Sequence, residues 1–152
     1  MNVIYVNKIE SPQPVRGHRS RNRRAPAHCV ASGKALLAWQ TDRFLAAIPE
    51  DLPKWTPHSL TTRQRLLDDL ADTRRRGFSI NRGEWRAAVG GVASPVFDAH
   101  GAAVASIGIS GPLERLSMPT LRSHAPLVIQ AARELSRALG YRGDAYPDSA
   151  AA

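Results

Sequence analysis

The sequence is poor in cysteine and in long hydrophobic runs. Its single cysteine, Cys29, excludes an internal disulfide framework. No run approaches the roughly 18 apolar residues of a membrane-spanning helix, so no membrane partner is expected. Residues 1–8 lack a basic region followed by a long apolar stretch, which argues against a signal peptide. These absences predict a cytoplasmic protein, and the length of 152 residues fits one domain.

Acidic residues are also few, 13 against 21 lysines and arginines, which gives a net charge of +8. The excess is local, because without five arginines in residues 16–24 the net charge falls from +8 to +3. They are Arg16, Arg19, Arg21, Arg23 and Arg24. The segment has no apolar periodicity, so it is predicted to be a solvated basic loop. A contact with an anion or a nucleic acid is the alternative.

Hydrophobic spacing predicts helices in the first half of the chain, after a short β-rich strand at residues 3–6. Residues 31–48 favour one or two helices, with Thr41 and Asp42 as an N-cap between them. A clearer helix begins near Thr61, which has capping-box spacing to Gln64. The apolar stripe of that helix comprises Leu66, Leu67, Leu70 and Ala71.

The second half of the chain alternates like strands and then returns to helical spacing. Gly77 is predicted to end the preceding helix, and residues 78–80, 89–97 and 103–110 are strand candidates with a hairpin turn at 98–101. A final helix ending at Gly140 has an apolar face made of Leu121, Ala125, Val128, Ala132, Leu135 and Leu139. A hairpin within a helix-flanked sheet predicts an α+β fold with a largely antiparallel sheet.

Motifs for catalysis are incomplete. Gly33-Lys34 resembles part of a phosphate-binding loop, but that motif needs a glycine and a hydroxyl where the chain has His28 and Ala35. Ser110 resembles the serine of a nucleophile elbow, but Pro112 stands where that turn needs glycine. Catalytic residues and a cofactor are therefore not expected.

Three other polar or titratable residues and one tryptophan need an interpretation. His28 and Cys29 are adjacent, but no second cysteine or HxxxH spacing supplies the three or four ligands that zinc requires. No metal site is therefore expected, and Cys29 is interpreted as a small buried apolar residue. Glu84 and Trp85 follow a strand, where they either line a pocket or serve as a turn carboxylate and a half-buried ring.

Two stretches carry motifs in a specific order. In residues 27–38 a histidine and small residues precede Gly-Lys-Ala-Leu-Leu-Ala. The second stretch begins with Arg-Gly-Phe-Ser at 76–79 and passes through Glu84 and Val-Ala-Ser-Pro-Val-Phe-Asp at 92–98. It ends with Ser-Gly-Pro at 110–112. In order and spacing, these elements and residues 131–140 resemble the effector-binding domain of the IclR family of bacterial transcription regulators, over roughly residues 3–142.

The resemblance implies a GAF- or profilin-like α+β domain that binds a small effector, often a carboxylate or an aromatic metabolite, and forms homodimers or tetramers. In the family this domain is joined to a winged helix-turn-helix domain that binds operator DNA. That domain is not found in this sequence, which opens at what resembles the effector domain's second strand. We therefore expect residues 1–142 to be an N-terminally truncated effector domain, followed by a disordered tail at 143–152.

The family's effector pocket, carried over position by position, implies six residues in this chain: Ala31, Ser32, Asn81, Gly91, Gly108 and Ser110. Backbone N–H groups of Ala31 and Ser32 would hold a carboxylate near a helix start. Asn81, where some members have an acid, offers an amide donor, and Ser110 retains a hydroxyl. Gly91 and Gly108 stand where some members have cysteine and serine. They predict a larger pocket, unless both glycines serve backbone packing.

These features predict a non-enzymatic, ligand-sensing domain of an IclR-type regulator. Such a domain reaches operator DNA only through a winged helix-turn-helix domain that is not in this chain. A stand-alone small-molecule binding or dimerisation module without a DNA role is the alternative, and a hydrolase or other enzyme is the third interpretation.

Overall fold

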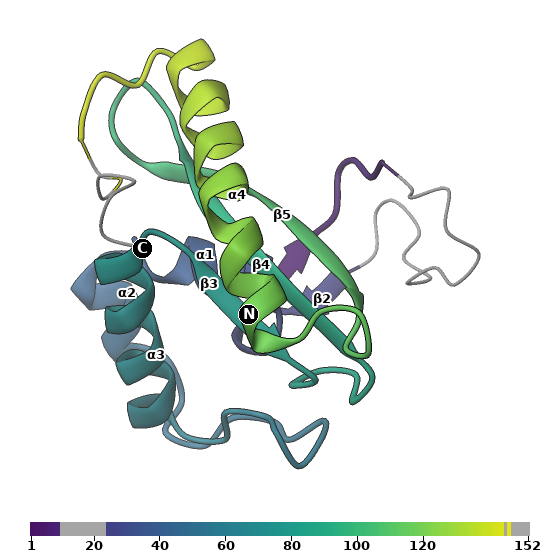
Figure 1. The fold of residues 1–152 in the computed structure, drawn as a ribbon. Helices are drawn as coiled ribbons and strands as arrows, with labels where there is room; N and C mark the ends of the chain where they lie inside the picture. Colours follow the sequence, from purple (N-terminus) through teal and green to yellow (C-terminus); the bar gives the residue numbers. More distant parts are fainter. Residues whose placement is uncertain (10–23, 145, 147–152) are drawn as a thin grey trace.

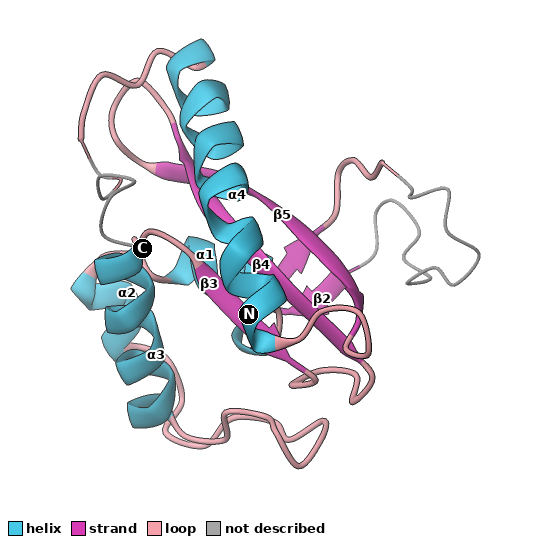
Figure 2. Ribbon diagram, in the orientation of Figure 1, coloured by secondary structure: helices cyan, strands magenta, loops and turns pink. Residues whose placement is uncertain are grey.

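The computed structural model describes residues 1–9, 24–144 and 146. Its centre is a three-stranded antiparallel sheet in the order β3-β4-β5. The strands are β3 (Ser79–Arg82), β4 (Val89–Phe97) and β5 (Ala103–Pro112). Helix α4 (Met118–Ala138) lies along one face of the sheet and α1 (Ala31–Leu37) lies behind the other (Figures 1 and 2). The predicted α+β class with an antiparallel sheet is confirmed.

The other elements flank this layered centre. A separate antiparallel pair joins β1 (Asn2–Ile4) to β2 (Arg24–Pro26), and a 3-10 turn, η1 (Ala27–Cys29), leads from β2 into α1. Helices α2 (Asp42–Ala46) and α3 (Arg63–Arg76) lie beside α1 (Figure 1). Most of the predicted basic loop lies outside the described residues; its last member, Arg24, begins β2.

The core is divided by β4, whose alternating side chains face two different helices. Val92 and Val96 pack in one cluster with Leu121 and Val128 of α4. Ala93, one residue from Val92, packs instead against α1. Successive side chains of a strand point to opposite faces, and β4 is therefore buried on both sides.

Among the helix-boundary signals, two lie where the sequence places them and one is shifted. The Thr41 hydroxyl accepts a hydrogen bond from the Phe44 N–H, as predicted for an N-cap. Gly77 ends α3 with φ 76°, a left-handed conformation that glycine adopts without steric cost. The cap of α3, however, is Thr62 and not Thr61. The Thr61 carbonyl accepts from the Leu52 N–H, so a tertiary contact moves the helix start by one residue.

The predicted helix faces contain three errors. Ala71 of α3 is exposed, and on α4 Leu135 and Leu139 are 42% and 46% exposed. The buried position at that end of α4 is Ser136, whose Oγ accepts a hydrogen bond from the Phe97 N–H and lies 2.7 Å from the Tyr146 hydroxyl. A specific polar contact therefore outweighs the apolar spacing of the leucines.

The tail was predicted to be disordered after Arg142, but Tyr146 does not fit that prediction. Its side chain is buried and its hydroxyl donates a hydrogen bond to the Pro95 carbonyl at 2.6 Å. Its ring meets Phe97 edge to face at 5.3 Å. Burial of the Tyr146 ring and of the partner of its hydroxyl offsets the cost of ordering that side chain. Residues 145 and 147–152 lie outside the described residues.

Candidate functional site

Four of the six predicted site residues lie on one face of the central sheet. Asn81 of β3 is opposite Gly91 of β4, which is opposite Ser110 of β5, so these three form one row across the strands. Gly108 lies two residues before Ser110 and therefore has the same facing. The strand register brings together residues that are up to 29 positions apart in the sequence.

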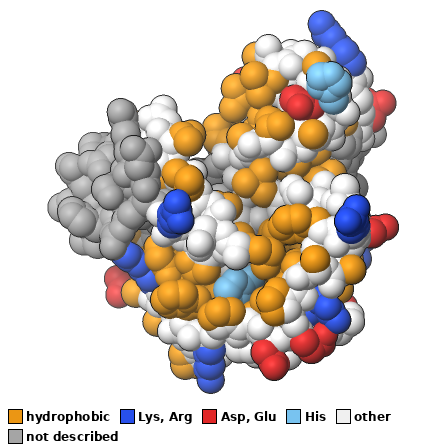
Figure 3. Space-filling model, turned by 180° about the vertical axis from the view of Figure 1, so that it is seen from behind, with side chains coloured by type: hydrophobic (Ala, Val, Ile, Leu, Met, Phe, Trp, Pro, Cys, Tyr) orange, Lys and Arg blue, Asp and Glu red, His pale blue; other side chains and the backbone are white. Residues whose placement is uncertain are grey.

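Helix α1 brings the other two predicted residues to the same face. The Ser79 hydroxyl donates to the Ala31 carbonyl at 2.6 Å, and the Ser106 hydroxyl donates to the Ser32 carbonyl at 3.0 Å. Ser79 and Ser106 occupy β3 and β5, so both outer strands are hydrogen-bonded to the start of α1. The face of the molecule opposite α4 carries hydrophobic side chains over its middle and widely spaced Lys and Arg side chains (Figure 3).

Tyr5 is a further residue at this place that the sequence did not single out. Its hydroxyl accepts a hydrogen bond from Ser32 Oγ at 3.3 Å. The short N-terminal strand was predicted, but nothing in its pattern indicated which residues its end would contact. The available signal was an aromatic residue with a polar tip just after a strand, a common arrangement at partly buried positions.

Asn81 serves the turn that follows β3. It is 2% exposed, and its Oδ1 accepts a hydrogen bond from the Glu84 N–H at 3.0 Å. The amide oxygen therefore holds the β3–β4 turn, and the group that Asn81 can offer to an anion is its Nδ2 donor.

The two glycines lie where neighbouring backbone approaches closely. A Cβ on Gly108 would be 2.4 Å from the Val92 carbonyl oxygen, and a Cβ on Gly91 would be 2.8 Å from the Ile109 carbonyl oxygen. Both distances are shorter than real Cβ contacts. This geometry favours the interpretation that the glycines permit close strand packing over the interpretation that they enlarge a pocket.

A buried ion pair lies beside the site. Lys34, which follows Gly33 in α1, is 1% exposed, and its Nζ is 2.9 Å from Glu84 Oε1 and 3.2 Å from Asp69 Oδ2. Burial raises the pKa of Glu84 above its ordinary value, while the ammonium of Lys34 opposes that shift. Of the two roles left open for Glu84, that of the turn carboxylate agrees with these contacts. No pattern in the sequence indicated that its partner would be Lys34.

His28 and Cys29 are packed beneath α1. His28 Nε2 lies 3.0 Å from the Pro53 carbonyl, an acceptor, so this nitrogen is the one that carries the proton. Burial lowers the pKa of His28 and raises the pKa of the Cys29 thiol to about 11. The prediction that Cys29 is a small buried residue is confirmed, since it is fully buried.

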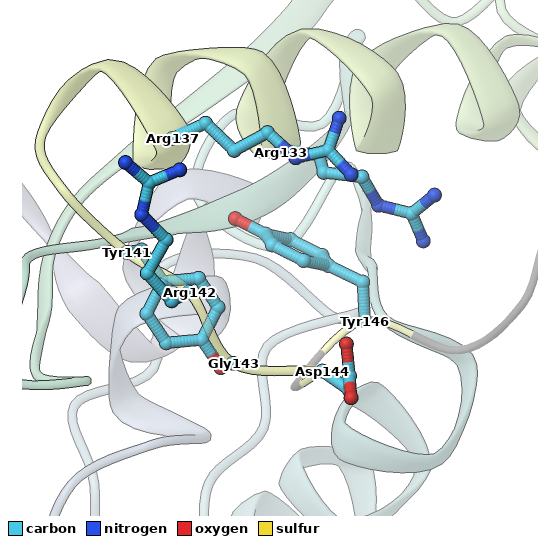
Figure 4. A pocket seen from close by; sticks show the side chains of 7 residues that line it. All are labelled: Arg133, Arg137, Tyr141, Arg142, Gly143, Asp144 and Tyr146. Atoms are coloured by element: carbon cyan, nitrogen blue, oxygen red, sulfur yellow. The ribbon is translucent and has the colours of Figure 1, made fainter.

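A hollow of about 590 Å³ lies elsewhere, at the C-terminal end of α4 (Figure 4). It is lined by Arg133, Arg137, Tyr141, Arg142, Gly143, Asp144 and Tyr146. None of the six predicted residues lines it, and its walls are mainly charged. Small-molecule sites are mostly apolar with a few placed polar groups, so the α1 face remains the better candidate.

Two further properties concern only the described part of the chain. Within residues 1–9, 24–144 and 146, no group of three or more histidine, cysteine or acidic side chains is placed to hold a metal ion. No helix in those ranges is long and apolar enough to cross a membrane.

Comparison with known proteins places this fold in a family. The family profile described as bacterial transcriptional regulator IclR C-terminal matches residues 1–137. The HTH-type transcriptional regulator BhcR of Paracoccus denitrificans is 33% identical over 145 residues, which are 94% of this chain and 52% of BhcR. The chain spans about half the length of the curated relatives it matches.

Solved structures agree with the sequence comparison. The repressor BlcR of Agobacterium tumefaciens matches with a TM-score of 0.82 and 30% identity over 93% of this chain and 57% of BlcR. The C-terminal domain of the Escherichia coli regulator KdgR matches with a TM-score of 0.72 and 31% identity, over 84% of this chain and 80% of that domain. The α+β fold is GAF-like, as the resemblance implied. The chain therefore belongs to the IclR family of bacterial transcriptional regulators and corresponds to their C-terminal domain.

Proposed function

We propose that this chain binds a small organic effector, a carboxylate or an aromatic metabolite, on the α1 face of its sheet. Binding there controls a DNA-binding domain of the whole regulator. The domain acts in the cytoplasm, without catalysis, and contacts operator DNA only through a winged helix-turn-helix domain that is not in this chain. The effector ligands are the six residues implied by the sequence: Ala31, Ser32, Asn81, Gly91, Gly108 and Ser110.

One observation carries the proposal: all six positions meet on one face. The row of Asn81, Gly91 and Ser110 runs across three strands, and the carbonyls of Ala31 and Ser32 are tied to the two outer strands. The Asn81 amide and the Ser110 hydroxyl provide hydrogen-bond donors from β3 and β5. An effector carboxylate bound between these two donors would contact both ends of the row, Asn81 and Ser110, and also the start of α1.

Such contacts provide a route from ligand to regulation. An effector that binds one arrangement of subunits better than another shifts the population toward the first. The free-energy coupling is limited to that difference in affinity. Here the effector would bridge α1 and the sheet. It would therefore favour the arrangement of subunits in which α1 and the sheet lie closest together.

The test is a thermal-shift screen of the purified chain against short-chain organic acids and aromatic acids. A true effector raises the melting temperature progressively as its concentration rises, and it adds about 2.7 kcal/mol of stability when it is present at 100 times its dissociation constant. Ser110→Ala is expected to weaken that response, whereas Ser123→Ala, an exposed serine on α4, should not. A response to no acid in the panel, or equal loss in both variants, contradicts the proposal.

Two negative results are also expected. Hits from the screen should be recovered unchanged after prolonged incubation with the chain, as measured by NMR, because the domain is proposed to bind without catalysis. In fluorescence anisotropy the chain alone should not distinguish an operator from scrambled DNA, and any residual binding should fall steeply with salt. Conversion of a hit, or operator preference at physiological salt, contradicts the corresponding part.

Self-association as a dimer or tetramer is the remaining part of the proposal, and β5 supports it. Among the described residues β5 is hydrogen-bonded on one side only, to β4. Its ten residues carry no charge, and Val104 and Ile109 are 53% and 39% exposed. An uncharged outer strand is prone to pair with another strand. Light scattering should show an oligomer that Val104→Lys weakens and Leu127→Lys, on exposed α4 surface, leaves intact; a monomer at high concentration argues against it.

A further inference from the structure

Lys34 connects three separate elements through one buried ammonium. It belongs to α1, Asp69 belongs to α3, and Glu84 lies in the turn between β3 and β4. The Nζ atom is 2.9 Å from Glu84 Oε1 and 3.2 Å from Asp69 Oδ2. At 1% exposure, Lys34 has almost no contact with solvent. The position of α1 relative to the turn therefore depends on this pair.

On the turn side, Glu84 is the residue that fixes Asn81. The Glu84 N–H donates to Asn81 Oδ1 at 3.0 Å, and the Glu84 carboxylate accepts from the Arg82 N–H at 3.4 Å. The Ser59 hydroxyl donates to the Glu84 carbonyl at 2.6 Å. Backbone and side chain of Glu84 are both held, so the orientation of the Asn81 amide follows that of Glu84.

On the helix side, Lys34 is the fourth of the seven residues of α1, three positions after Ala31. Its backbone N–H donates to the Val30 carbonyl at 3.0 Å. Ser79 holds the Ala31 carbonyl from β3. The start of α1 is thus tied to β3 and its turn at two points, the Ser79 hydrogen bond and the Lys34–Glu84 ion pair.

Stability alone does not account for this arrangement. Burying an ion pair costs desolvation free energy that hydrophobic residues of the same volume would avoid. Glu84 Oε2 is buried, and among the described residues it has no hydrogen-bond partner, which adds to that cost. An ion pair does, however, define a distance and a direction between two elements, which apolar packing does less strictly.

We propose that Lys34, through Glu84, is a positioning residue for the effector site. It sets the Asn81 amide at a fixed place relative to the Ala31 and Ser32 backbone. The inference rests on the proposed function, since it concerns the same face of the sheet. It adds residues that do not themselves contact the effector.

The test compares two isosteric variants that each remove one carboxylate from Lys34. Glu84→Gln removes the partner next to Asn81, and Asp69→Asn removes the partner on α3. If the network only stabilises the fold, both variants act alike. If Lys34 positions the site, only Glu84→Gln changes the site, and Asp69→Asn, the matched control, leaves the site unchanged.

Amide hydrogen exchange followed by NMR gives a readout that needs no ligand. In Glu84→Gln, exchange at positions 82 and 84 should rise by about tenfold as hydrogen bonds of the turn open, with exchange in α4 unchanged. In Asp69→Asn it should rise at those positions by less than about twofold. Equal changes in both variants, or protection of positions 82 and 84 unchanged in Glu84→Gln, overturn the proposal.

A second readout is affinity for sodium benzoate and sodium pyruvate, used as an aromatic and a short-chain acid probe. For whichever probe the unmodified chain binds, Glu84→Gln should raise the dissociation constant by about tenfold and Asp69→Asn should not. If the unmodified chain binds neither probe nor any acid of the wider screen, the proposed function fails, while the exchange data still decide whether Lys34 orders the turn. If it binds and the two variants behave alike, only the positioning role fails.

Where Glu84→Gln does not fold, Lys34→Met combined with Glu84→Gln removes both charges together and leaves Asp69 facing Arg76 at 4.0 Å. The double variant avoids a buried ammonium that has lost its nearer carboxylate and keeps only Asp69, the main reason for the single variant to unfold. The same exchange pattern supports the proposal, and wild-type protection at positions 82 and 84 overturns it.

Discussion

Replacing Gly108 by alanine tests whether the glycines of this site serve the backbone or the pocket. A Cβ at this position would be 2.4 Å from the Val92 carbonyl oxygen and 2.7 Å from Ala93 Cβ. An ordinary contact begins at 3.4 Å, so β5 would have to move by about 1.0 Å to restore one. Overpacking of this kind costs typically about 1–3 kcal/mol.

The matched control is Gly111→Ala in the same strand. Its Cβ would meet Leu116 at 3.5 Å, an ordinary van der Waals contact. The φ angles of Gly108 and Gly111 are both outside the left-handed region, so the two substitutions differ in space and not in backbone conformation. Gly111→Ala is expected to be neutral or to stabilise by up to about 1 kcal/mol, because alanine reduces the freedom of the unfolded chain.

Thermal unfolding followed by circular dichroism measures the difference. At about 2–4 °C per kcal/mol for a chain of this size, Gly108→Ala should melt about 2–12 °C lower than the unmodified chain. Equal melting temperatures for the two variants would refute the close approach of the strands. The combined Gly91→Cys and Gly108→Ser variant would then be expected to stay folded and to select smaller ligands, as the pocket interpretation requires.

Three further outcomes follow from buried groups and a helix cap. The Cys29 thiol, with its pKa raised to about 11, should not react with a thiol reagent in the native chain at about pH 8 but should react after denaturation; rapid labelling of the native chain contradicts its burial. Burial lowers the pKa of His28 below 6.5 in the folded chain, so as the pH falls the unfolded chain is protonated at His28 before the folded chain is. The stability that is present above about pH 6.5 is therefore lost as the pH falls toward the lowered pKa of the folded chain. His28→Gln should flatten the fall in melting temperature between about pH 7 and 5, and an unchanged slope counts against that assignment. Thr62→Ala should lose about 1 kcal/mol of stability and Thr61→Ala less, measured by urea unfolding; the reverse order would restore Thr61 as the cap.

Much of the fold was predictable because its signals are local. Gly77, the Thr41 cap and the hairpin turn at residues 98–101 each depend on backbone conformation or hydrogen bonding within a few residues. Their interactions do not require the rest of the chain to be in place. The family motifs added the positions of the candidate site, since residue order and spacing are properties of the sequence.

Other features depended on partners far away in the chain. Ser136 replaced Leu135 and Leu139 at the buried end of α4 because its hydroxyl meets the Phe97 N–H, 39 residues away. No helical periodicity could indicate that partner. The Phe97 N–H and the Tyr146 hydroxyl are brought to Ser136 by the tertiary fold and not by its neighbours in the helix.

The sequence by itself determined the longer helices and strands, the antiparallel class and the family. Tertiary structure decided that Asn81, Gly91 and Ser110 share a row, because strand register is set by pairing between segments. It also decided that the lysine of Gly33-Lys34 is a buried ion-pair partner, since its two carboxylates come from α3 and from the β3–β4 turn. Spacing along one chain specifies local geometry, whereas the burial of a charge depends on which distant groups close around it.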